Sequence, residues 1–293
     1  MKKFLPVLSI ALLLFGCQKS EQSKPSKETK YNVSFKMDDF SQIVVPMADK
    51  KSTAFGDTLK NYVTNLYFKL YDETGTLIKS NEQLSSSATF GTFTEQLAQG
   101  EYTAFFVATT GALSFSGTQY TTSVYFPTSN TFWNDTYAIT YAFSVNSTPL
   151  TSLIKMGRAI GAIEVNIEDV IPSNISKVTL TYTKDSPKLR LSGNADGIYG
   201  STTKEFTLTS ADYNIQNKKF LMHVGNVFGV PSTVVIKAYD TNGKLSTEKT
   251  VSNVIAYQNK KTVLTGQAFP SQNSTFKITV DPTWGTAPNT IKF

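Results

Sequence analysis

An alternation of apolar and polar residues with a period of two runs through the chain, and it limits the fold more than any other feature. It first shows in residues 31–37, YNVSFKM, and returns in residues 66–70. Successive side chains of a β-strand point to opposite faces, so such segments are predicted to be half-buried strands. Apolar residues at the helical spacing of about 3.6 never continue for more than about two turns. The sequence therefore predicts an all-β protein, with short helices at most near residues 211–213 or 151–154.

Turn signals divide the strands into two groups. In the first group, residues 72–75, DETG, turn one strand into the next, as Asp and Gly do in tight turns. Residues 68–77 and 236–245 repeat Lys, Tyr, Asp, Gly and Leu in register, which indicates either two related domains or merely two similar strand–turn–strand segments. We predict an amino-terminal domain at residues 31–152 and a carboxyl-terminal domain at residues 153–293, each long enough for a β-sandwich of about 100 residues.

The first residues have the features of an export signal. Lys2 and Lys3 precede an apolar run at residues 5–14, and the sequence LFGC then places the only cysteine, Cys17, after a glycine. This arrangement resembles a bacterial lipoprotein signal peptide with its lipobox. The resemblance implies that processing removes residues 1–16 and attaches a diacylglyceryl group to the Cys17 thiol. A short membrane anchor and an ordinary signal peptide are the alternatives, although roughly ten apolar residues cannot span a bilayer that needs about twenty.

A polar segment separates this signal from the first strand. Residues 17–30 are rich in Lys, Glu, Ser and Gln, which is typical of a disordered tether. Residues 18–21 loosely resemble the signal that sends lipoproteins of the Bacteroidota to the outer face of the outer membrane, but a plain linker has the same composition. The expected location is the outer membrane, through the lipid anchor, with exposure at the cell surface.

Charge and cysteine content exclude further classes of protein. The net charge is +6, yet the lysines are scattered and the only arginines are Arg158 and Arg190. Nucleic-acid-binding proteins gather Lys and Arg on one face, so we expect no nucleic-acid partner. The lysines are expected to keep the surface soluble and strand edges protected, with weak attraction to anionic envelope glycans as the alternative. Because Cys17 is the only cysteine, the fold is expected to form without disulfides.

The sequence contains no catalytic or metal-binding motif. The single histidine, His223, would point away from the side of a strand that carries Met222 and Val224, so a solvent-facing or hydrogen-bonded side chain is expected rather than a base or a ligand. Adjacent carboxylates at residues 38–39 and 168–169 face opposite ways along a strand and are not placed as a glycosidase pair. For residues 194–197, NADG, a turn is favoured over a calcium site. We predict no enzyme activity, no cofactor and no metal.

The two tryptophans lie in sequence typical of turns, next to Asn, Asp or Pro. Trp133 occurs in TFWND and Trp284 in DPTWG. Aromatic side chains in surface loops can stack on sugar rings, so both residues are candidates for ligand stacking. Capping of a sandwich core is the alternative role.

Four segments together resemble the fimbrillin-like lipoproteins of the Bacteroidota, a family of fimbrial shaft, tip and anchor subunits. They are the lipobox at Cys17, LAQGEY at residues 97–102, GRAIGAIEV at residues 157–165 and NKKTVLTG at residues 259–266. The resemblance implies two tandem transthyretin-like β-sandwich domains after the signal peptide and tether. It also implies assembly by donor-strand exchange, in which one subunit lends a strand to a groove in the next, a form of β-augmentation.

The resemblance also implies which strands are candidates for exchange. They are the first and last strands, with apolar residues at Tyr31, Val33, Phe35 and Met37, and at Phe276, Ile278 and Val280. In polymerising members of the family an arginine-specific protease removes the first strand, whereas no arginine precedes Arg158 here. Either another protease acts, or the chain stays closed as an anchor or a surface adhesin. The last strand has the alternative role of completing the second sandwich.

The function predicted from these features is that of a non-enzymatic, lipid-anchored envelope protein of fimbrial or adhesive type. Its expected partners are fimbrial subunits, or host and glycan ligands. The alternative function is that of a glycan-binding surface lipoprotein that uses Trp133 and Trp284.

Overall fold

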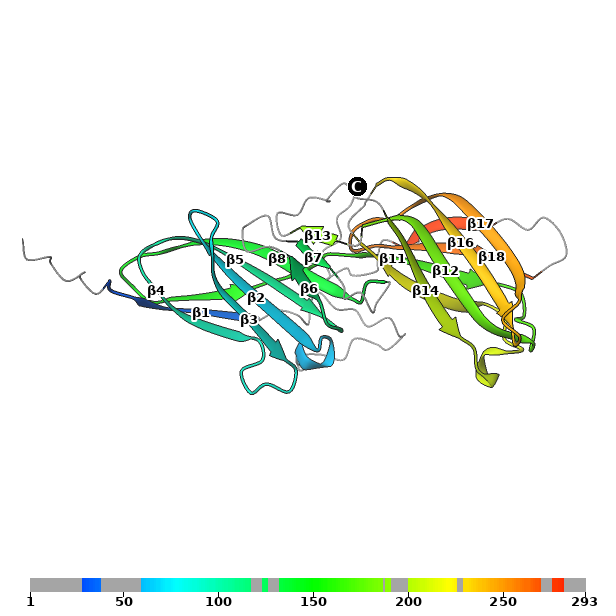
Figure 1. Cartoon of the computed structure of the whole chain (residues 1–293), viewed down its shortest axis with the longest axis horizontal. Helices are drawn as coiled ribbons and strands as arrows, with labels where there is room; N and C mark the ends of the chain where they lie inside the picture. Colours follow the sequence, from blue (N-terminus) through cyan, green and yellow to red (C-terminus); the bar gives the residue numbers. More distant parts are fainter. Residues whose placement is uncertain are drawn as a thin grey trace, which may run out of the picture.

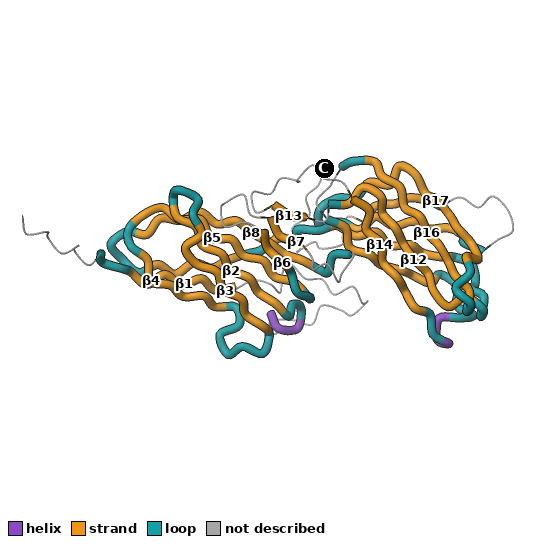
Figure 2. The backbone as a smooth tube through the Cα atoms, viewed as in Figure 1, coloured by secondary structure: helices purple, strands orange, loops and turns teal. Residues whose placement is uncertain are grey.

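Strands make up almost all of the regular structure. The computed structural model describes residues 28–37, 59–116, 123–125, 132–186, 188–190, 200–225, 229–269 and 276–281. The strands form two groups that follow each other along the chain (Figure 1). Within the described residues the only helical segments are two single 3₁₀ turns, η2 (Leu59–Asn61) and η3 (Ser210–Asp212) (Figure 2). The all-β prediction is confirmed, as is a short helix near residues 211–213.

The first half is a sandwich of two sheets. One sheet has the order β4 (Thr92–Leu97), β1 (Tyr31–Met37), β9 (Leu150–Ile154). The other has the order β10 (Gly157–Arg158), β8 (Thr136–Val145), β5 (Gly100–Thr109), β2 (Asn65–Asp72), β3 (Leu77–Leu84). Inward-facing residues of both sheets, among them Phe35, Phe68 and Phe106, form one buried core. The short helix that the sequence allowed near residues 151–154 does not form, because that segment is β9, which pairs parallel to β1.

The second half is built in the same way. One sheet has the order β15 (Lys218–Val224), β11 (Gly161–Ile167), β18 (Lys261–Gly266), β19 (Lys277–Asp281). The other has the order β14 (Gly200–Thr207), β12 (Ile175–Asp185), β16 (Pro231–Asp240), β17 (Leu245–Ile255). Ile163, Leu180 and Ile236 lie in the core between these sheets. Two tandem β-sandwiches, as predicted, therefore form the protein.

The two halves repeat one topology. β1 pairs antiparallel with β4 and parallel with β9, and β11 pairs antiparallel with β15 and parallel with β18. In the opposing sheets, the order β3-β2-β5-β8 corresponds to the order β14-β12-β16-β17. β19 adds a fourth strand outside β18, whereas β9 has no strand on its outer side within the described residues.

The sequence similarity between residues 68–77 and 236–245 has a local cause. In both hairpins an aspartate side chain accepts hydrogen bonds from the backbone two and four residues later: Asp72 from Thr74 and Thr76, Asp240 from Asn242 and Lys244. Gly75 and Gly243 then take positive φ angles of 79° and 77°, where glycine is favoured. However, β2–β3 holds the second and third positions of its sandwich, and β16–β17 the fifth and sixth. The similarity therefore reflects the same turn chemistry and not equivalent places in the two domains.

A third, small sheet joins the two halves. Its order is β13 (Lys188–Arg190), β7 (Ser123–Tyr125), β6 (Ser114–Ser116). β6 and β7 come from the connection between β5 and β8 of the first half, whereas β13 follows β12 of the second half. The predicted domain boundary between residues 152 and 153 stays a prediction; β9 and β10, at residues 150–158, pair with strands of the first half.

Candidate functional site

The first candidate for strand exchange, β1, lies in the middle of its sheet. It pairs with β4 on one side and with β9 on the other. Val33 and Phe35 are completely buried, and Tyr31 and Met37 are partly buried against the same core. The Phe35 ring lies 5.7 Å from that of Phe68, 5.3 Å from Phe106, 6.3 Å from Tyr141 and 5.1 Å from Phe143. In this conformation the chain fills its own groove.

Loss of β1 would leave a groove suited to another strand. Its walls would be the facing edges of β4 and β9, whose backbone groups now bond to β1. Its floor would be the aromatic cluster around Phe68 and Phe106, which Phe35 now covers. Backbone hydrogen bonds and alternate side-chain pockets are the two elements of β-augmentation. Removal of β1 would therefore expose unpaired backbone edges and side-chain pockets together in one groove.

The second candidate, β19, is held far more loosely. Among the described residues it pairs only with β18, and Ile278 and Val280 remain 38% and 40% exposed. Phe276, just before the strand, is partly buried and packs against the second core. The strand is therefore an added edge rather than part of the core, and either of its predicted roles, exchange or completion of the sandwich, is compatible with this position.

A row of charges crosses the sheet that ends in β19. Glu164 of β11 lies 3.9 Å from Lys219 of β15 and 3.0 Å from Lys261 of β18, and Lys261 lies 3.8 Å from Asp281 of β19. Glu164 and Lys261 are only 11% and 16% exposed, so these two charges are partly shielded from water. One lysine of the sequence pair Lys260–Lys261 thus has a structural partner on each side.

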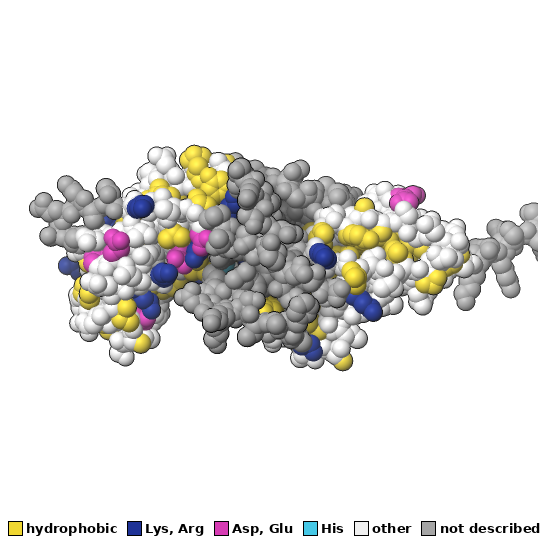
Figure 3. Space-filling model, turned by 180° about the vertical axis from the view of Figure 1, so that it is seen from behind, with side chains coloured by type: hydrophobic (Ala, Val, Ile, Leu, Met, Phe, Trp, Pro, Cys, Tyr) yellow, Lys and Arg dark blue, Asp and Glu magenta, His cyan; other side chains and the backbone are white. Residues whose placement is uncertain are grey.

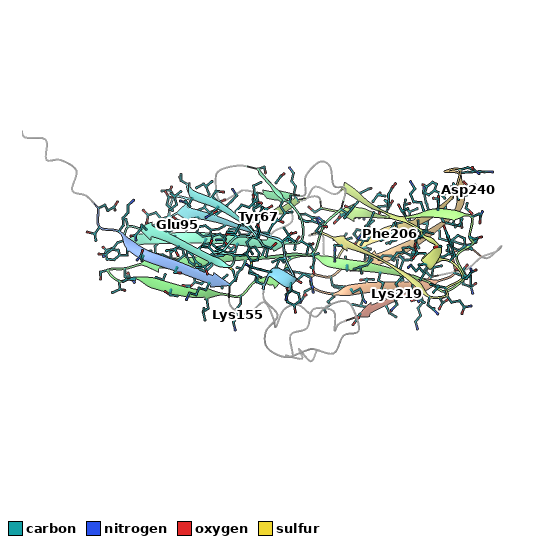
Figure 4. The ribbon with its side chains drawn as sticks, turned by 90° about the horizontal axis from the view of Figure 1, so that it is seen from below. Tyr67, Glu95, Lys155, Phe206, Lys219 and Asp240 are labelled. Carbon is teal, nitrogen blue, oxygen red and sulfur yellow. The ribbon has the colours of Figure 1, made fainter. Side chains whose placement is uncertain are left out.

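The charges visible on one face of the molecule do not form a single patch. On the face drawn in Figure 3, lysines and acidic side chains are interspersed, and apolar side chains gather in a band over the amino-terminal half. β9 is the last strand of its sheet among the described residues, and its Leu153 is 57% exposed. Lys155, directly after β9, lies at the lower margin of the first half in Figure 4. A lysine beside an open strand edge is a common protection against uncontrolled pairing.

Trp133 does not lie on the surface, which corrects the ligand-stacking prediction for this residue. Its side chain is completely buried, and its Nε1 donates a hydrogen bond of 2.9 Å to the carbonyl oxygen of Ser186. Because both ring faces are covered, Trp133 cannot stack on a sugar in this conformation. The second predicted stacking residue, Trp284, lies outside the described residues.

A buried ion pair that the sequence reasoning missed lies next to Trp133. Arg158 is 2% exposed and donates to both carboxylate oxygens of Asp135, at 2.7 and 3.0 Å, and to Tyr137 Oη at 2.5 Å. Burial alone would raise the pKa of Asp135, but the hydrogen bonds and charge of Arg158 outweigh it, and the pKa is lowered. The available signal was the presence of one arginine and one aspartate in otherwise uncharged strand sequence.

Two further titratable groups lie in the same region. Asp185 is completely buried and accepts hydrogen bonds from Thr202 Oγ1 and from the backbone N–H groups of Ser186 and Gly225; burial raises its pKa to about 6. His223 points away from the core that contains Met222 and Val224, as predicted. Its side chain is only partly exposed, and burial lowers its pKa to about 4; its backbone forms an isolated β-bridge with Trp133.

The remaining candidates give no site. Asp169 accepts hydrogen bonds from the backbone N–H groups of Ala268 and Phe269, which gives it a structural role. Three other candidates lie outside the described residues: Cys17, the carboxylates at residues 38–39 and the NADG segment at residues 194–197. Within the described part of the chain, no cluster of three His, Cys, Asp or Glu residues is arranged for a metal ion. The same residues contain no helix with the length and apolarity to cross a membrane.

The chain shares a short stretch of sequence with a known fimbrial protein. No family model matches the chain. A stretch of 77 residues is 31% identical to the minor fimbrium tip subunit MfA4 of Porphyromonas gingivalis, and it spans 26% of this chain but only 22% of that protein.

Solved structures match over most of the chain. The fimbrial anchor protein Mfa2 of P. gingivalis superposes with a TM-score of 0.51 at 11% identity, over 89% of this chain and 99% of that one. A candidate adhesin from Bacteroides ovatus gives 0.54 at 11% identity, over 82% and 88% of the two chains. A candidate polysaccharide-binding protein from Bacteroides thetaiotaomicron gives 0.55 at 12% identity, over 88% and 97%. The shared fold and the local sequence match support the resemblance to fimbrillin-like proteins of the Bacteroidota.

Proposed function

We propose that this chain, which shares its two-sandwich fold with a fimbrial anchor and with candidate adhesins, is a non-enzymatic, lipid-anchored protein of the cell envelope with a fimbrial or adhesive role. Within that role it is an anchor or accessory subunit that associates with other fimbrial subunits. The local match to a fimbrium tip subunit supports the same class of function.

The observation that carries this proposal is the position of β1. A shaft subunit must present an open groove, whereas here β1 lies at the centre of its sheet with Phe35 completely buried. No arginine precedes Arg158, so an arginine-specific protease has no site at which to free β1. A closed subunit that is tied to the membrane at its amino terminus fits the base or the surface of an assembly better than its repeating shaft.

The lipid anchor gives a direct prediction. Cys17→Ser removes the thiol that carries the lipid, so the variant is expected in the soluble fraction after cell lysis, whereas the wild-type chain sediments with the membranes. Each buried CH₂ of an acyl chain contributes about 0.8 kcal/mol to membrane binding, so the loss of all chains releases the protein almost completely. Immunoblots of the two fractions measure this, with Ser20→Ala as the control. Sedimentation of Cys17→Ser with the membranes contradicts the anchor.

Association with fimbrial subunits is tested on envelopes of the native organism. Strand-exchanged complexes are held by many backbone hydrogen bonds, so this chain is expected in high-mass bands on gels of unheated samples and at its monomer mass after boiling. Only the monomer band in both samples would contradict the fimbrial part of the proposal.

Glycan binding is the weaker alternative. The burial of Trp133 removes one of the two stacking residues on which it rested. One solved structure of similar fold is described as a candidate polysaccharide-binding protein, which keeps the class open to test. Retardation in affinity gels that is lost in Trp284→Ala would favour it over the fimbrial role.

A further inference from the structure

A tryptophan of the first half is enclosed by the second half. Trp133 donates its Nε1–H to the carbonyl oxygen of Ser186, which follows β12, and its backbone bridges to His223 of β15. At Gly225 there is no room for a side chain, since a Cβ atom there would lie 2.5 Å from the Ser186 carbonyl oxygen and would also clash with Trp133 Nε1. The second half thus forms a fitted socket for the indole ring.

The socket is held together by the buried carboxyl of Asp185. This group accepts hydrogen bonds from the N–H of Ser186 at 2.9 Å, from the N–H of Gly225 at 2.6 Å and from Thr202 of β14. One side chain therefore fixes the two backbone segments that contact Trp133. The first half contributes the other wall, because Trp133 also belongs to the apolar cluster on the outer face of β2 and β5 that contains Tyr67, Phe105 and Ile160.

A second set of contacts crosses between the halves at Arg158. Its guanidinium is bound to Asp135 and Tyr137 of the first half, and its Nη1 donates 3.2 Å to Asn259 Oδ1 of the second half. In return, Gln258 Nε2 donates 3.1 Å to the carbonyl oxygen of Arg158, and the Asn259 N–H donates 2.9 Å to the carbonyl oxygen of Ile160. Separation of the halves would break these three crossing hydrogen bonds, one of them donated by a charged group, while Arg158 would keep its bonds to Asp135 and Tyr137.

The third contact is the small sheet that both halves build together. β13 of the second half pairs antiparallel with β7 of the first, from Lys188 opposite Tyr125 to Arg190 opposite Ser123. Three different types of contact, namely an enclosed aromatic ring, a buried charge network and a strand pair, thus connect the same two bodies.

From this geometry we infer that the junction, defined as Trp133, Arg158 and Asn259 with the socket of Asp185, Ser186 and Gly225, locks the two sandwiches into one cooperative, rigid unit. Domains of one chain otherwise tend to move relative to each other unless their interface is large and apolar. The lock fixes the direction in which the carboxyl-terminal half, with β19, points from the attachment at the amino terminus. Only this last consequence rests on the proposed function; the coupling itself does not.

The test compares the opening of the two cores by hydrogen exchange and mass spectrometry in increasing urea. In the wild-type chain, peptides from β5 and from β12 are expected to lose protection at the same urea concentration. Asn259→Gly removes the side chain that bonds to Arg158, and glycine suits the positive φ of 54° at this position. In this variant the two transitions are expected to separate. The less stable half should exchange about tenfold faster relative to the other half, which is the factor expected for the loss of one buried hydrogen bond.

Two more variants make the result specific. Asn253→Gly is the matched control, because Asn253 also has a positive φ, 61°, but is exposed on β17; it should leave the transitions together. Trp133→Phe keeps an aromatic ring but leaves the Ser186 carbonyl without its donor, and it should separate them as Asn259→Gly does. Independent opening of the halves in the wild type, or equal behaviour of Asn259→Gly and Asn253→Gly, would overturn the lock. Since purified protein is used without membrane or partners, the result does not depend on the fimbrial role.

Discussion

Phe35→Ala is expected to lower the free energy of unfolding by about 3–5 kcal/mol, the usual cost of truncating a buried Phe to Ala. The reason lies in the contacts of the ring, which is completely buried and packs against four aromatic rings of the opposing sheet. Urea unfolding followed by circular dichroism measures the change.

The matched control for this variant is the next residue of the same strand. Lys36 is exposed on the other face of β1, so Lys36→Ala should change the free energy by no more than about 0.5 kcal/mol. If Phe35→Ala were as mild as Lys36→Ala, β1 would not occupy its groove in solution. The account of a closed subunit would then be wrong.

The second large effect concerns buried Asp185 and partly buried His223, whose pKa values are shifted in opposite directions. Burial raises the pKa of Asp185 from 3.8 to about 6, so its contribution to stability is full below pH 3.8 and is lost as the pH rises through about 6. Burial lowers the pKa of His223 from 6.5 to about 4, so its contribution is full above pH 6.5 and is lost as the pH falls through about 4. Between about pH 4 and pH 6 the two pH dependences therefore nearly cancel in the wild-type chain.

Single variants should reveal each half of this balance. In Asp185→Asn only the pH-dependent contribution of His223 remains, so the free energy of unfolding relative to wild type should fall as the pH is lowered from 6 to 4. In His223→Gln only the pH-dependent contribution of Asp185 remains, so the free energy of unfolding relative to wild type should rise as the pH is lowered from 6 to 4. Each change should reach about 2 kcal/mol, because a difference of one proton between the folded and unfolded states gives about 1.4 kcal/mol per pH unit and the difference falls to about half a proton towards the ends of this range.

The measurement is urea unfolding of both variants and the wild type at pH 4, 5 and 6. Glu73→Gln, at an exposed turn, serves as the control for the loss of a carboxylate on the surface. Parallel pH profiles of Asp185→Asn and His223→Gln would contradict the opposite burial effects at the junction.

The sequence was sufficient for features that depend on local order. The alternation at Tyr31–Met37 correctly predicted β1 and the inward direction of Val33 and Phe35, because strand periodicity alone decides which side chains share a face. The DETG turn likewise predicted the β2–β3 hairpin, since Asp72 and Gly75 supply its side-chain hydrogen bonds and its positive φ.

Features that depend on distant segments were not accessible in this way. Trp133 has polar neighbours in sequence, and it is buried between Ser186 and Gly225 of the other half and an apolar cluster of its own half. Residues 151–154 carry no clear period, and their pairing with β1, more than a hundred positions earlier, makes them a strand. The repeat of the two sandwiches is likewise visible in strand order but not in residues, because topology constrains only which positions are apolar.

The central claim, that this chain joins a fimbrial or adhesive assembly with β1 still in place, is tested most directly by peptide mapping. High-mass complexes from unheated native envelopes would be digested, and peptides of this chain from residues 31–36 quantified against peptides from β12. The account predicts that both sets occur in equal amounts, because a closed subunit keeps its first strand. Complexes that contain β12 peptides but lack residues 31–36 would show that β1 is removed on assembly and would contradict it.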